Sequence, residues 1–88
     1  MKLTSVPFSV AAEYFGNLLS VPKGTKHIAI DENSEVWAYP TEQRPTAGKM
    51  LWSVAGCFDM TKVGIADLEG MDWKDTLMTL NTESKEED

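Results

Sequence analysis

Two short, mainly apolar runs in the first half of the chain are separated by polar turn residues and predict one β-hairpin. The strands span residues 26–31 and 35–39, which leaves three residues between them for the turn. A turn of this length usually ends with a residue in the left-handed region. Because no glycine lies in this turn, Asn33 or Ser34 must adopt that conformation.

The length of the turn also fixes the register of the hairpin and sorts its side chains by chemistry. It pairs Ile30 with Val36. Two residues further along it pairs Ile28 with Ala38, so this face of the hairpin is aliphatic. The opposite face carries His27, Ala29, Trp37 and Tyr39. A sheet in so small a domain has only one well-covered face, and we therefore expect Trp37 and Tyr39 to be at least partly exposed.

The region before the hairpin has apolar residues at helical spacing and predicts a helix over residues 9–19. Ser9 is a suitable N-cap, and Glu13 lies in the first turn, near the positive end of the helix dipole. The apolar stripe that would face the core comprises Ala11, Tyr14, Phe15, Leu18 and Leu19. Gly16 lies inside this helix, where it costs about 1 kcal/mol relative to alanine and allows close packing on a sheet.

The second half of the chain predicts another antiparallel pair and a short final helix. The pair comprises residues 49–54 and 60–66, joined by a turn at 55–57. Asp72 is a suitable cap for the final helix. One face of that helix carries Trp73, Leu77 and Leu80.

These elements together predict an α+β fold, in which an N-terminal helix packs on a mainly antiparallel four-stranded sheet and a short C-terminal helix closes the domain. The chain has 88 residues, enough for a single domain that buries about 60–65% of its unfolded surface. We assign residues 1–80 to this domain. Residues 81–88 contain four acids, one lysine and no apolar side chain, and they predict an acidic disordered tail.

The charge and the cysteine content limit the kinds of function that the protein can have. Fourteen acids against eight bases give a net charge of −6, which argues against direct binding to the phosphate backbone of nucleic acids. The lone Cys57 excludes an intramolecular disulfide and suits a reducing cytoplasm. No apolar run approaches the roughly 20 residues that a membrane span needs. The apolar segment 6–12 is broken by Pro7 and Ser9, so it does not predict a signal peptide.

The turn of the hairpin superficially resembles a calcium-binding loop. Asp31, Asn33 and Glu35 stand at the first, third and fifth positions of an EF-hand loop, and Glu42 stands at the twelfth. The sixth position of such a loop requires glycine for a sharp turn, but Val36 occupies it. We therefore expect no metal site.

The sequence contains no recognisable catalytic constellation. His27 and Cys57 each occur once, and nucleophilic catalysis needs a base that is oriented by a third group. The simpler interpretation is a half-exposed strand histidine and a small buried thiol. We therefore expect a protein that is not an enzyme and that carries no cofactor.

Aromatic residues are the best candidates for recognition, because tryptophan and tyrosine dominate binding hot spots and also stack on nucleobases. The alternative for each ring is that it fills the core, as aromatic rings in small domains usually do. The residues that we expect to contribute to a binding surface are His27, Trp37, Tyr39, Arg44 and Trp52.

Several of these residues belong to a pattern that resembles a small protein family of tailed bacteriophages. The resemblance is carried by the motif VP-x-GTKHIA-x-DEN-x-EVWAY at 21–39, by Pro45 and Trp52, and by DWKDTL at 72–77. This chain departs from the pattern at Ser34, where glycine is common, and conservatively at Thr76, where serine is common. The resemblance implies a phage-encoded protein that is made in the host cytoplasm, and it assigns no catalytic residue.

The leading hypothesis is thus a non-enzymatic phage accessory protein. It would bind and modulate a host macromolecule, such as a defence or replication protein, through the face of Trp37 and Tyr39 and nearby acids. The alternative is a sponge that sequesters a small nucleotide signal, with the base stacked on an aromatic ring and Lys26, Arg44 or Lys49 on the phosphate. A second copy of the chain could also cover the rings. A DNA mimic ranks lowest, because the acids are scattered along the chain.

Overall fold

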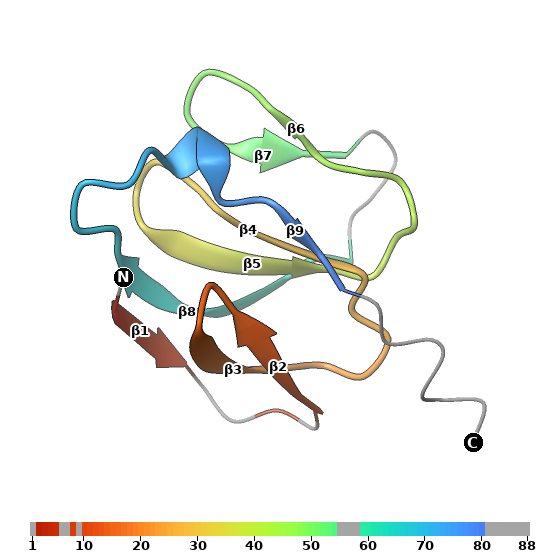
Figure 1. Ribbon diagram of the computed structural model, residues 1–88. Helices are drawn as coiled ribbons and strands as arrows, with labels where there is room; N and C mark the ends of the chain where they lie inside the picture. The colour runs from red at the N-terminus through yellow and green to blue at the C-terminus, as the bar shows by residue number, and fades with distance from the viewer. Residues whose placement is uncertain (1, 6–7, 9, 55–58, 81–88) are drawn as a thin grey trace.

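The computed structural model describes residues 2–5, 8, 10–54 and 59–80. Within these residues the fold consists of β-strands, one 3₁₀ turn and no α-helix (Figure 1). One antiparallel sheet has five strands in the order β1-β8-β5-β4-β9, and two small sheets consist of the pairs β2-β3 and β6-β7. The bounds are β1 Lys2–Ser5, β2 Val10–Tyr14, β3 Asn17–Val21, β4 His27–Ile30, β5 Glu35–Tyr39, β6 Thr46–Ala47, β7 Trp52–Ser53, β8 Thr61–Asp67, η1 Trp73–Asp75 and β9 Met78–Thr79.

The predicted β-hairpin is confirmed as β4 and β5. Ile30 pairs with Val36 and the rest of the register follows, as the turn length requires. Ser34 adopts the left-handed conformation, with φ of 74°. The side chain of Asn33 accepts a hydrogen bond from the backbone N–H of Glu35 at 3.1 Å, which stabilises the turn without glycine.

The predicted N-terminal helix is wrong, because these residues form the antiparallel hairpin β2-β3. Burial alternates along β2: Ala12 and Tyr14 are buried, whereas Ala11 and Glu13 are exposed. Burial that alternates with a period of two residues is typical of a strand that packs one face against the core. The predicted N-cap, Ser9, lies outside the described residues.

The two-residue turn between β2 and β3 explains this difference. Phe15 and Gly16 have φ of 48° and 80°, as in the type I′ turns that join hairpin strands. Glycine adopts this conformation without steric cost, so Gly16 suits a turn between two strands better than the interior of a helix. As a result, the expected apolar stripe is divided between two sides, and Leu18 is 77% exposed.

The second half of the chain also pairs differently from the prediction of a four-stranded sheet. The strand β8 lies between β1 and β5 in the large sheet, whereas β7 pairs with β6. The pairing of β1 with β8 joins segments that are about 60 residues apart in the sequence, and an alternating pattern cannot specify such a distant partner. The predicted turn at 55–57, with Cys57, lies outside the described residues.

The predicted C-terminal helix is also wrong beyond its first turn. Asp72 does cap it, since its side chain accepts a hydrogen bond from the backbone N–H of Lys74 at 3.0 Å. The helical conformation ends after the three residues of η1, and Met78–Thr79 then pairs with β4 as an edge strand. The predicted tail, residues 81–88, lies outside the described residues.

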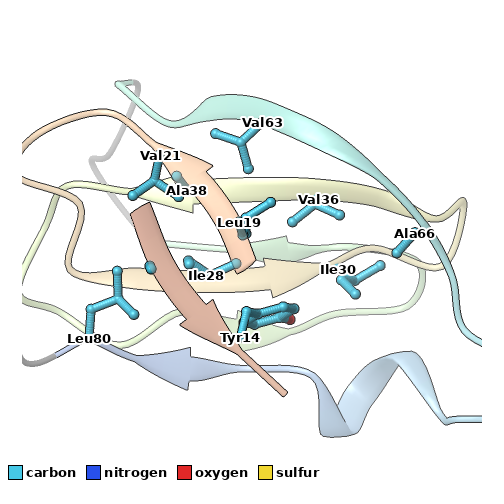
Figure 2. Packing of buried hydrophobic residues seen from close by; sticks show 11 residues of the cluster. Tyr14, Leu19, Val21, Ile28, Ile30, Val36, Ala38, Val63, Ala66 and Leu80 are labelled. Carbon is cyan, nitrogen blue, oxygen red and sulfur yellow. The ribbon is translucent and has the colours of Figure 1, made fainter. Parts of the chain in front are cut away.

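The main hydrophobic core lies between the large sheet and the β2-β3 hairpin (Figure 2). The sheet contributes the aliphatic face of β4 and β5 together with Val63 and Ala66 of β8. The hairpin contributes Tyr14, Leu19 and Val21, all at most 1% exposed. This arrangement confirms that the aliphatic face is core, although a hairpin covers it instead of a helix.

A second core lies on the opposite face of the same sheet. It comprises Ala29, Tyr39, Trp52, Val54 and Trp73. Residues 40–54, which contain β6 and β7, cross this face together with η1 (Figure 1). The expectation that only one face of the sheet is covered is therefore wrong.

Candidate binding surface

Tyr39 and Trp52 belong to the second core and do not present an open aromatic surface. Tyr39 is 1% exposed, and its hydroxyl donates a hydrogen bond to the carbonyl oxygen of Trp52 at 3.4 Å. The indole N–H of Trp52 donates to the carbonyl oxygen of Ile30 at 3.0 Å, and its ring meets that of Trp73 edge to face. The expected exposure of Tyr39 is therefore wrong, because the covering segment brings Trp52 onto it.

Two hydrogen bonds join this covering segment to the turn of the β4-β5 hairpin, and a third closes a turn within the segment itself. The carboxylate of Asp31 accepts from the backbone N–H of Trp52 at 2.8 Å. The backbone N–H of Glu32 donates to the carbonyl oxygen of Met50 at 3.0 Å, and that of Gly48 donates to Leu51 at 2.8 Å. The turn of the β4-β5 hairpin is thus the anchor for the cover of the second face.

His27 is buried, so the expectation of a half-exposed histidine is wrong, and its ring contacts two other parts of the chain. It is 2% exposed, with Nδ1 at 3.0 Å from the hydroxyl of Thr79 and Nε2 at 3.2 Å from the carbonyl oxygen of Glu42. A carbonyl oxygen only accepts, so Nε2 carries a proton and donates. The histidine therefore fastens the loop after β5 and the edge strand β9 to β4, beside a cavity of about 250 Å³.

One part of the second face remains open, and it includes Trp37. We call this part the open strip and define it by Glu35, Trp37, Lys62 and Ile65. Glu35 pairs with Ile65 and Trp37 pairs with Lys62 across β5 and β8, and the register of the two strands shifts between these pairs. Because of this irregularity Lys62 and Ile65, three residues apart, lie on the same face of the sheet as Glu35 and Trp37. Ile65 is 54% exposed, whereas Trp37 is half-buried. The expectation that Trp37 is partly exposed is confirmed.

The polar groups of the open strip are arranged around Glu35. Its carboxylate accepts from the ammonium group of Lys62 at 3.0 Å. This hydrogen bond is the largest of the influences that lower the pKa of Glu35. The indole nitrogen of Trp37 is shielded from solvent and makes no hydrogen bond of normal geometry, but its proximity also helps to lower the pKa of Glu35.

Arg44 lies on a different part of the molecule, at the edge of an open groove of about 580 Å³. This groove runs between the β6-β7 pair and the segment around η1. Its lining comprises Arg44, Pro45, Thr46, Ala47, Trp52, Lys74, Asp75 and Leu77. Of the residues predicted from the sequence, the structure thus brings Arg44 and Trp52 together at the groove and joins Trp52 to Tyr39 in the second core. Trp37 packs against the same core, whereas His27 lies outside it.

Sequence reasoning missed Ile65 and Lys74 as surface residues. Ile65 is an apolar residue in a strand that the sequence predicts. Its exposure follows from the position of β8 between β1 and β5, which the sequence did not predict. Lys74 belongs to the DWKDTL motif, which had been interpreted as a packing helix. The sequence did contain a signal for it, because Lys74 is a charged residue between Trp73 and Leu77, which were both expected to pack on the sheet.

Within the described ranges, no group of three or more histidine, cysteine, aspartate or glutamate residues is placed to hold a metal ion. Over the same residues, no helix has the length and apolar character needed to cross a membrane. The chain matches no protein-family model, and it has no significant match among curated proteins or solved structures.

Proposed function

We propose that this chain is a non-enzymatic accessory protein of a phage, that it acts in the host cytoplasm, and that it binds and modulates a host protein through the open strip. The observation that carries this proposal is the exposure of Ile65, at 54%, beside the half-buried Trp37 on a rigid sheet. The resemblance to phage proteins supplies the biological setting.

The open strip has an apolar pair, Trp37 and Ile65, next to a pair of opposite charges, Glu35 and Lys62. Tryptophan is enriched among hot-spot residues, and a flat strand surface presents it without a large loss of conformational entropy on binding. The ion pair between Lys62 and Glu35 adds polar groups at the margin of the apolar contact. The net charge of −6 favours a partner whose complementary surface is basic.

Other exposed apolar residues support this choice less well. Leu18 is more exposed, at 77%, but it pairs with Glu13 on the outer side of the β2-β3 hairpin and has no tryptophan in the pair. Leucine is also under-represented among hot spots. Leu18 is therefore a matched control for Ile65, since both are exposed strand residues on different parts of the molecule.

The test is capture of a partner from nuclease-treated host lysate by the tagged chain and by two variants, Ile65→Glu and Leu18→Glu. We expect one host protein to bind the wild type and Leu18→Glu, but not Ile65→Glu. Equal capture by all three would exclude the open strip as the contact surface. If no host protein binds, and the purified chain is a dimer that Ile65→Glu separates, then the partner is a second copy of the chain.

A further inference from the structure

The groove next to the second core is not used by the proposed function. Its floor is apolar, because it is formed by Pro45, Trp52 and Leu77, of which the first two are buried and the last is half-buried. Trp52 is only 6% exposed, and it contributes to the lining of the groove. The floor is also rigid, since hydrogen bonds to Asp31 and Ile30 fix Trp52 from behind.

The margin of the groove carries two exposed cations, Arg44 and Lys74. Neither side chain forms an ion pair or a hydrogen bond with any part of the chain that the structure describes. Asp75 is the one acid of the lining. In a chain of net charge −6, this groove therefore has a local excess of positive charge.

We infer that the groove binds a small phosphorylated ligand with a flat apolar body, of the nucleoside monophosphate class. The guanidinium group of Arg44 can donate two parallel hydrogen bonds to a phosphate, and the ammonium group of Lys74 adds a second positive charge. The apolar floor takes the base, and the carboxylate of Asp75 accepts from a ribose hydroxyl or an exocyclic amine. A volume of about 580 Å³ is within the usual range for sites of this kind.

Isothermal titration of the whole chain with AMP, GMP, CMP and UMP tests this inference, with adenosine and inorganic phosphate as the separate halves of one ligand. We expect at least one nucleotide to bind, and its nucleoside and inorganic phosphate to bind at least tenfold more weakly. Arg44→Ala and Lys74→Ala should each weaken that nucleotide at least tenfold. The matched control is Lys23→Ala, which removes an exposed lysine outside the lining of the groove.

Several outcomes would overturn the inference. They are the absence of binding by all four nucleotides at millimolar concentration, equal affinity for inorganic phosphate alone, and unchanged affinity in both groove variants. Melting temperatures close to that of the wild type would show that the variants are folded. Ile65→Glu should bind the nucleotide as the wild type does, so failure of this site and failure of the open strip are distinguishable.

Discussion

The backbone N–H of Trp52 donates a 2.8 Å hydrogen bond to the carboxylate of Asp31, which is 8% exposed. This contact joins the turn of the central hairpin to the segment that crosses the second face of the sheet. Burial raises the pKa of Asp31, and the hydrogen bond from Trp52 opposes part of that rise. The residue that anchors the cover therefore makes the stability of the fold depend on pH.

We expect Asp31→Asn to remove this dependence while keeping an oxygen that can accept from Trp52. The pKa of Asp31 is higher in the folded state than the value of about 3.9 expected for an unfolded chain. Its contribution to stability is therefore complete below pH 3.9 or so and is lost as the pH rises through the folded pKa. Urea unfolding at a series of pH values should show the variant gaining stability relative to the wild type as the pH rises.

Glu35 provides a control of opposite sign. Its pKa is lowered, chiefly by the hydrogen bond from Lys62, so its contribution is present above the unfolded value and is lost as the pH falls through the folded one. The deficit of Glu35→Gln relative to the wild type should thus disappear on acidification. If both variants changed with pH in the same direction, the assignment of the two carboxylates would be incorrect.

Gly16→Ala distinguishes the observed hairpin from the helix that the sequence suggested. In a helix interior this substitution stabilises by about 1 kcal/mol. In the observed turn, Gly16 has φ of 80°, and an alanine there is strained by about 1–2 kcal/mol although its Cβ would meet nothing within 4 Å. Thermal melts should show a loss of stability. A gain would support the helix.

Tyr39→Ala should unfold the domain or destabilise it by about 3–5 kcal/mol, as expected when a fully buried aromatic ring is removed. Tyr39→Phe keeps the ring and loses only the hydroxyl that donates to Trp52, at a cost of about 1 kcal/mol. Urea unfolding of the two variants gives both values. Wild-type stability of Tyr39→Ala would show that the second core does not exist.

Thr76 is the polar centre of the contact between η1 and the sheet. Its hydroxyl accepts from the backbone N–H of Ile30 at 2.9 Å and lies 2.7 Å from the carbonyl oxygen of Trp73. Its own carbonyl oxygen accepts from the hydroxyl of Tyr14. Thr76→Val leaves a buried N–H without its acceptor, which costs about 1–3 kcal/mol, whereas Thr76→Ser keeps the hydroxyl. Equal melting temperatures for these two variants would contradict this role.

The sequence was sufficient to predict the central hairpin, because the residues that determine its register are close together in the chain. The three residues of its turn set the register, and Ser34 was one of the two residues expected to supply the left-handed conformation. The sequence was not sufficient to assign the secondary structure where the spacing of apolar residues fits both a helix and a strand. Residues 10–21 satisfy both a helical stripe and a strand alternation, and only the turn at Phe15 and Gly16 decides between them.

The binding surface could not be predicted from local sequence patterns, because it depends on contacts between distant parts of the chain. The register placed Trp37 and Tyr39 on one face correctly, but their exposure depends on where the segment from 40 to 54 crosses that face. The open strip likewise needs β8 beside β5, a pairing between distant parts of the chain. Arg44 is a candidate from the sequence, whereas its neighbour in the groove, Lys74, follows only from the tertiary fold.

The most direct test of the central claim is the dissociation constant of the captured partner for Trp37→Ala and Ile65→Ala, measured by isothermal titration at a temperature where circular dichroism shows both to be folded. If the open strip is the contact surface, Trp37→Ala should weaken binding by about 2 kcal/mol or more, which is roughly 30-fold. Ile65→Ala should weaken it by a smaller factor, and Leu18→Ala should leave it unchanged. Wild-type affinity in both folded strip variants would contradict the account.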